Sequence, residues 1–127
     1  RSKGKEVMEG FIKAENGGGD ICAVYAHNDD MAVGAIQAIK DAGLKPGTDI
    51  KVVSIDGVPD IFAAMVAGEA NATVELTPNM AGPAFEALSA YLADGTEPEK
   101  LIITESKLYT PADNPQGEYD TRKSLGY

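Results

Sequence analysis

The sequence has a single cysteine, a single histidine and no tryptophan, and all of its apolar runs are short. Because Cys22 is alone, the chain can form no internal disulfide and can build no cysteine-based metal site by itself. No apolar run approaches the roughly 18 residues that cross a bilayer, and no basic and apolar leader opens the chain. We therefore expect a chain that does not insert directly into a membrane and from which any signal sequence has been removed.

Motifs that hold cofactors or carry out catalysis are also missing. No GxGxxG or GxxxxGK(S/T) motif follows a predicted strand, and the glycines at 17–19 precede a strand instead of opening a helix. There is no GxSxG turn, and His27 has no obvious nucleophile to activate. The acidic residues Asp29, Asp30 and Asp56 do not have the spacing of a calcium loop. The sequence predicts a protein that is not an enzyme and that binds neither a cofactor nor a metal.

The charge balance excludes another class of partner. The formal net charge is -9, and the 11 basic residues are scattered without a cluster. A chain of this charge repels phosphate backbones, so we expect no nucleic acid partner. With 127 residues, of which 43% are hydrophobic and 24% charged, the composition is that of one globular domain or a piece of one.

Apolar periodicity divides the chain into alternating helices and short strands. The predicted order is a helix over 3–15, a strand over 21–26, a helix over 29–42, a strand over 50–55, a helix from Pro59 to a cap at Gly68, a strand over 72–76, a helix over 80–92 and a last strand over 101–109. The sequence after Pro111 is polar and shows no clear pattern.

This alternation predicts an α/β fold, namely a doubly wound parallel sheet with right-handed crossovers and helices on both faces. We expect Ala84, Phe85, Leu88 and Leu92 to form the inner face of the helix over 80–92, and Tyr25 and Phe62 to lie in the core with Phe85. The chain begins with a helix, so the first strand that such a sheet requires is not supplied, and we expect a partial domain.

Polar residues follow each predicted strand directly. Asn28 and Asp29 come after the first strand, Asp56 ends the second, and Glu75 and Leu76 end the third. Ligands of open parallel sheets bind outside the carboxyl ends of the strands, where these residues would meet. A carboxylate accepts hydrogen bonds from neighbouring hydroxyls and an amide both donates and accepts, so the combination suits a polyhydroxylated ligand.

Structural roles are open for the same residues. Asn28 can be a helix N-cap, and Asp29 and Asp30 can interact with the helix dipole in the first turn. Asp56 can be a turn residue before a glycine. His27 is more typical of a histidine that packs or faces solvent than of one that binds a ligand.

Three stretches resemble a known family: AHNDDMAVGAIQAIKDAGLKPG, VVSIDGVPDIFAAMVAGEANATVELTPNMAG and ESKLYT. Together they are similar to the C-terminal lobe of periplasmic sugar-binding proteins of the ribose and galactose group, and look closest to the galactofuranose-binding branch. The pairing of an Asn-Asp strand end with a later Asp-Gly strand end is specific to this superfamily.

The resemblance implies a type I periplasmic binding fold, in which two α/β lobes joined by a hinge close on one sugar. Residues 1–127 would form a partial C-terminal sugar-binding lobe without its first strands, with 110–127 as a hinge or tail region. The implied function is to capture a monosaccharide in the periplasm and deliver it to the membrane permease of an ABC importer. The missing N-terminal lobe of the same protein would complete the cleft.

The resemblance also implies roles for individual residues. Asn28 and Asp56 match the strand-end asparagine and aspartate that contact sugar hydroxyls in the family. A third position, usually glutamine or asparagine, falls on Leu76, which weakens that contact. Glu75 beside it is a candidate substitute, and Asp29 is a further candidate. Because the periplasm is oxidising, we expect Cys22 to form a disulfide with a cysteine outside this chain.

Two other functions compete with sugar import. Regulators of the Lac-repressor type use a similar effector-binding lobe, although no helix-turn-helix or basic element is visible in this sequence. A nucleotide-binding α/β enzyme is the third hypothesis, and the missing phosphate motifs disfavour it.

Overall fold

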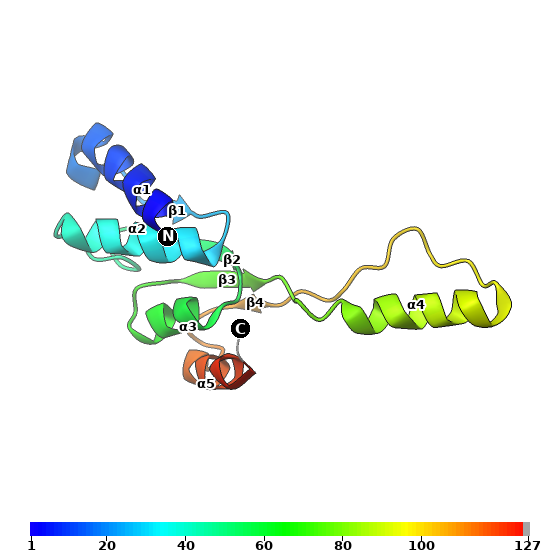
Figure 1. The fold of residues 1–127 in the computed structure, drawn as a ribbon. Coiled ribbons are helices and arrows are strands. Elements are labelled where there is room, and N and C mark those ends of the chain that lie inside the picture. The colour runs from blue at the N-terminus through cyan, green and yellow to red at the C-terminus, as the bar shows by residue number, and fades with distance from the viewer. Residues whose placement is uncertain (126–127) are drawn as a thin grey trace.

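The computed structural model describes residues 1–125 and is built on a four-stranded sheet (Figure 1). The strands are β1 (Ala23–Tyr25), β2 (Lys51–Asp56), β3 (Ala72–Glu75) and β4 (Leu108–Tyr109), arranged in that order. The first three are parallel, whereas β4 runs antiparallel to β3. The α/β class with a mostly parallel sheet is confirmed. Residues 126 and 127, the end of the expected hinge or tail, lie outside the described residues.

The predicted helices form close to their expected positions. The structure contains α1 (Ser2–Ala14), the short 3-10 helix η1 (Asn16–Gly18), α2 (Asp29–Asp41), α3 (Pro59–Val66), α4 (Ala81–Asp94) and α5 (Pro115–Leu125). Pro59 is the first residue of α3, where its missing N–H would have no helical partner in any case. The last helix, α5, was not predicted, because the polar sequence after Pro111 carries little apolar periodicity. None of the helices within residues 1–125 combines the length and apolar character needed to cross a membrane.

The sheet is covered on one face and open on the other. Ser54 and Thr73 are buried on the covered face, whereas Val74 on the opposite face is 37% exposed. In β4, Tyr109 is buried and its neighbour Leu108 is 57% exposed. The prediction of helices on both faces is therefore wrong for the described residues. The right-handed crossovers from β1 to β2 and from β2 to β3 step in the same direction across the sheet, so α2 and α3 fall on one face. The helices α1 and α5 pack on α2 and α3, respectively.

The packing of α1 on α2 depends on a close approach of their backbones. A Cβ added at Gly34 would lie 2.1 Å from the Arg1 carbonyl oxygen, so no larger residue fits there without a shift. Lys5 and Asp41 form an ion pair of 2.6 Å across the same helices. The core beneath α2 includes the buried residues Ile36 and Ile39.

Two of the three aromatic residues assigned to the core are exposed instead. Phe62 is fully buried, and its ring meets that of Tyr109 edge-on at 5.2 Å between centroids. Tyr25 is 59% exposed because it lies on the open face of β1, and Phe85 is 66% exposed on α4.

The α4 helix does not pack on the sheet. Residues 76–107, here called the arm, leave the body formed by residues 1–75 and 108–125 and return to it (Figure 1). The expected inner face of α4 is exposed, with Phe85, Leu88 and Leu92 at 66%, 49% and 74%. The predicted strand over 101–109 is reduced to Leu108–Tyr109, because the residues before it extend beyond the sheet and have no neighbouring strand. Both expectations were wrong for the same reason: the chain leaves the sheet after β3.

Candidate functional site

The carboxyl ends of β1, β2 and β3 lie along one edge of the sheet, here called the rim. The rim carries Asn28 after β1, Asp56 at the end of β2 and Leu76 after β3. Parallel pairing holds the strand ends level, since Asp56 is opposite Glu75 in the register of β2 and β3. The structure therefore brings the strand-end residues predicted from sequence to one edge.

The buried carboxylate of Asp29 holds the backbone next to the rim in place. Its Oδ2 accepts hydrogen bonds from the backbone N–H groups of Gly57 and Val58 at 2.6 and 2.8 Å. Its Oδ1 accepts bonds from the hydroxyls of Ser54 and Thr73. One carboxylate thus ties the start of α2 to the turn after β2 and to the middle of β3. With no exposed surface and four donors already bound, Asp29 has a structural role, and a direct contact with a ligand is not supported.

Asn28 has the capping role that its position allows. It precedes α2 in an extended conformation, and its Oδ1 accepts a hydrogen bond of 2.8 Å from the N–H of Met31. The N-cap alternative is confirmed by this bond. Because capping uses only the side-chain oxygen, the Nδ2 group stays available as a donor at the rim.

Asp56 combines backbone strain with an unfavourable environment for its charge. Its φ angle is 130°, a region that residues with a Cβ rarely adopt. The side chain is partly buried. Burial raises the pKa of the Asp56 carboxyl, and the nearby charge of Asp29 raises it further, while backbone hydrogen bonding at Asp29 opposes the shift. Strain together with a perturbed carboxyl at a strand end is typical of a functional residue.

The third strand contributes less to the rim. Leu76 is 55% exposed, and its backbone N–H donates a 3.0 Å bond to the carbonyl oxygen of Asp56. The carboxylate of Glu75 is already occupied, because Oε1 accepts a 3.0 Å bond from Arg122 and Oε2 a 3.4 Å bond from the Tyr109 hydroxyl. Glu75 is thus engaged in the body and does not replace the polar residue that Leu76 lacks.

Sequence reasoning missed the group that binds Glu75. Arg122 of α5 is only 5% exposed, and its Nη2 also contacts the Tyr109 hydroxyl at 3.1 Å and Glu118 at 3.4 Å. The single available signal was the spacing of Glu118 and Arg122, which places opposite charges on one face of a helix. That signal is common on exposed helices and does not indicate burial.

The chemistry available at the rim is that of hydrogen bonding. It offers one amide and one carboxylate, and the described residues contain no group of three acidic, histidine or cysteine side chains placed to hold a metal ion. A separate cavity of about 370 Å³ lies between α1, β1 and α2, lined by Phe11, Tyr25 and His27 among others. This cavity is mostly apolar and includes neither Asn28 nor Asp56, so it is distinct from the rim.

Cys22 lies just before β1, not inside it as expected, and is exposed and unpaired within the described residues. Its backbone carbonyl extends the sheet by accepting a 2.9 Å bond from Lys51. The expected disulfide involves a cysteine outside this chain, and it stays a prediction.

Comparisons with known proteins agree on the type of protein. A family model described as "Periplasmic binding protein domain" matches residues 1–97. The galactofuranose-binding protein YtfQ of Escherichia coli is 69% identical over all 127 residues, which correspond to 40% of its length.

Two solved structures have the same fold with high similarity. The crystal structure of a galactofuranose-binding protein matches 99% of the chain with a TM-score of 0.93 and 69% identity, and the match covers 42% of that structure. The binding protein of the arabinose transporter of Shewanella sp. ANA-3, solved with L-arabinofuranose, matches 97% with a TM-score of 0.89 and 56% identity, covering 40% of that structure. The chain therefore spans about two fifths of the length of these relatives.

Proposed function

The chain belongs to the periplasmic binding protein family, and from this we propose that it is part of a solute-binding protein that captures a monosaccharide between two lobes and delivers it to an ABC importer. This is a family of binding proteins and not of enzymes. The relatives reported above are named for furanose sugars, so we propose a furanose as the ligand and the periplasm as its location. Their names favour this function over the regulator and nucleotide-enzyme alternatives.

One observation carries the proposal: Asp29 holds the two proposed sugar-binding residues in a fixed arrangement. Asn28 directly precedes Asp29, and Asp56 directly precedes Gly57, whose N–H is bound to Asp29 at 2.6 Å. The amide and the carboxylate are thus carried on backbone that a single buried group clamps. A rigid pair of this kind suits adjacent hydroxyls of one sugar ring, because preorganised groups lose little entropy on binding.

The second lobe and the permease are further parts of this proposal. The chain covers about two fifths of its relatives, and the arm presents apolar side chains that nothing in the described residues covers. An exposed apolar helix face is typical of a surface that packs against another domain. We propose that the missing N-terminal lobe of the same protein covers it and completes the sugar cleft. The closed protein would then dock on the membrane permease.

The test is calorimetric titration of the intact protein with D-galactose, L-arabinose and D-ribose, whose solutions contain furanose forms. Asp56→Asn removes one charged acceptor, and Asn28→Ser removes the amide donor while keeping an N-cap oxygen. Each variant should lose about 1 to 3 kcal/mol of binding free energy, which is roughly a 5-fold to 150-fold loss of affinity.

Asp20→Asn is the matched control, since Asp20 is an exposed aspartate in the turn before β1. It should bind as the unchanged protein does. Equal affinities for all three variants would remove Asn28 and Asp56 from the site, whereas an unchanged protein that binds none of the sugars would contradict the proposed ligand class.

A further inference from the structure

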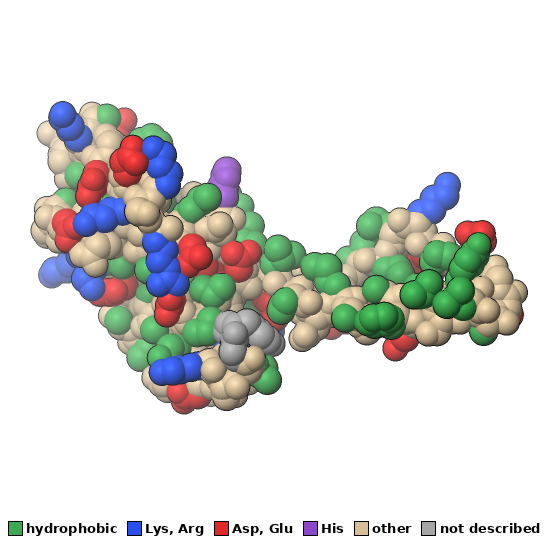
Figure 2. Space-filling view, viewed as in Figure 1, with side chains coloured by type: hydrophobic (Ala, Val, Ile, Leu, Met, Phe, Trp, Pro, Cys, Tyr) green, Lys and Arg blue, Asp and Glu red, His purple; other side chains and the backbone are tan. Residues whose placement is uncertain are grey.

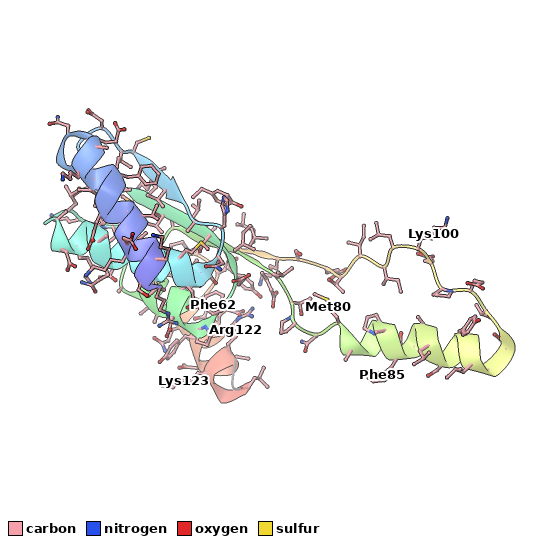
Figure 3. The ribbon with its side chains drawn as sticks, turned by 45° about the horizontal axis from the view of Figure 1, so that its top comes forward. Phe62, Met80, Phe85, Lys100, Arg122 and Lys123 are labelled. Carbon is pink, nitrogen blue, oxygen red and sulfur yellow. The ribbon has the colours of Figure 1, made fainter. Side chains whose placement is uncertain are left out.

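Arg122 is a cation that lies buried in the body, where a charged side chain is unusual. It comes from the last described helix, yet its guanidinium reaches β3, β4 and the turn after β2. Figure 3 shows Arg122 beside Phe62 in the body, well away from Met80 and Phe85 of the arm. The guanidinium carbon lies 4.9 Å from the centroid of the Phe62 ring.

Arg122 lies next to two neighbours of Asp56, one along the chain and one across the sheet. Along the chain, the next residue is Gly57, where an added Cβ would lie 3.5 Å from Nη1 and 3.6 Å from the guanidinium carbon. Across the sheet, the neighbour of Asp56 is Glu75, whose Oε1 accepts the 3.0 Å bond from Nη2. Arg122 therefore binds the partner of Asp56 in β3 and lies close to the residue that follows Asp56, without being at the rim itself.

The same guanidinium fixes both ends of the arm. The arm begins after Glu75 and returns two residues before Tyr109, and Arg122 binds the side chains of both. The Tyr109 hydroxyl also donates to Glu75, which closes a ring of three side chains. Burial opposes the charge of Arg122 and is the largest single influence on it, but the hydrogen bonds and charges of Glu75 and Tyr109 together outweigh burial and raise the pKa, so the cation is retained.

A buried cluster of this kind orients its partner side chains more than it stabilises the fold. Removing two charges from water is costly, and buried ion pairs can often be replaced by apolar residues with little loss of stability. Among the described residues, Nε of Arg122 is buried without a hydrogen-bond partner, which adds to that cost. What the pair does supply is geometry, because the planar guanidinium accepts only a narrow set of partner positions.

We propose that Arg122 is a positioning residue of the sugar site, which sets the orientation of Asp56 and the start of the arm through its hydrogen bonds with Glu75 and Tyr109 and its place beside Gly57. The effect on sugar affinity rests on the proposed function, whereas the effect on the rim backbone does not. Arg122 does not touch the ligand; it acts through the backbone that carries Asp56.

The main test compares Arg122→Met/Glu75→Gln with the unchanged intact protein. The double variant removes both charges of the Arg122–Glu75 pair and leaves only Glu118, which reaches solvent, without its cation, so its thermal unfolding should stay within a few degrees of the unchanged protein. Its affinity for D-galactose or L-arabinose should fall about tenfold or more. Hydrogen exchange of the Gly57 and Leu76 amides, which bond to Asp29 and Asp56, should accelerate by a similar factor.

Two further variants separate positioning from charge and from general stability. Arg122→Lys keeps the cation but loses the planar fork, and it should show a smaller loss of affinity and faster exchange at the same two amides. This variant also decides the question if the double variant does not fold. Lys123→Met is the control, because Lys123 is an exposed cation next to Arg122 in the sequence whose ammonium bonds to the Tyr119 hydroxyl and not to Glu75 or Tyr109, and it should change nothing.

Failure of the Arg122 proposal and failure of the proposed function give different results in these experiments. Affinity and amide exchange equal to those of the unchanged protein, in both Arg122 variants, would overturn the proposal. A lower unfolding temperature with unchanged affinity and exchange would also overturn it, since the role would then be stability alone. If the unchanged protein binds none of the sugars, the proposed function fails, and the amide exchange still decides whether Arg122 positions the rim.

Discussion

The body and the arm contain the same kinds of apolar side chain at the same helical spacing, but only the body buries them. Phe62 of α3 has no exposed surface, while Phe85 and Leu92 of α4 are 66% and 74% exposed. Figure 2 shows the hydrophobic side chains of the arm gathered on its surface. Periodicity thus predicts that a helix has an apolar side, but it does not predict what covers that side or whether the covering is part of the same segment.

The largest difference between the two regions should appear in how the isolated 127-residue chain associates. The uncovered side of α4, the open face of the sheet and the edge of β1 recruit other chains, so we expect oligomers or aggregates. Size-exclusion chromatography with light scattering measures this. Replacing Phe85, Leu88 and Leu92 by glutamine should shift the distribution towards monomer.

Replacing Glu86, Ser89 and Asp94 by glutamine, on the same helix, serves as the control and should leave the association in place. A compact monomer that unfolds cooperatively would contradict the expectation for the arm. It would mean that the exposed apolar residues of α4 are tolerated in solution.

The next largest effect concerns two matched substitutions in the isolated chain, measured by urea unfolding at concentrations below those at which it associates. Phe62→Ala opens a cavity in the body and should cost about 3 to 5 kcal/mol of unfolding free energy. Phe85→Ala changes an exposed residue and should stay within about 0.5 kcal/mol. In the intact protein the cost of Phe85→Ala should rise to about 3 kcal/mol, since the second lobe would cover the ring. A cost that does not rise would argue against that lobe as the partner of α4.

The smallest effect is the pH dependence that Asp56 gives to the body. Because its pKa is raised in the folded state, ionisation of Asp56 at neutral pH opposes folding, and this penalty disappears as the pH falls and the carboxyl becomes protonated. Asp56→Asn should therefore be slightly more stable than the unchanged protein at neutral pH and equal to it in acid. Thermal unfolding across that pH range measures the difference. A variant that is less stable at neutral pH would show that the charge stabilises the rim.

Local sequence signals were sufficient for the elements and for the location of the rim. Short apolar runs ending in polar residues located β1, β2 and β3 within one or two residues, and Asn28 before an apolar stripe indicated the cap of α2. These features depend on residues close to one another in the chain. The position of the rim followed from the rule for parallel sheets.

Contacts between distant segments could not be predicted in the same way. No pattern near Asp29 in the sequence indicates its bonds to Ser54 and Thr73. Arg122 lies 47 residues from Glu75, so no local pattern indicates that pair either. The antiparallel direction of β4 likewise follows from the excursion of the arm and not from the residues of β4. Sequence periodicity contains no information on such pairings, because they depend on how complete elements are placed.

The arm is joined to the body by two adjacent strands and not by one linker. Where it leaves and returns, the N–H of Glu75 donates a 2.8 Å bond to the carbonyl oxygen of Lys107, so the two connections form a single ribbon at their base. A helix on one linker can rotate freely, whereas a helix on a paired ribbon retains mainly bending and twisting about the axis of that ribbon. The motions open to a unit that packs on α4 are therefore restricted to a hinge about this ribbon.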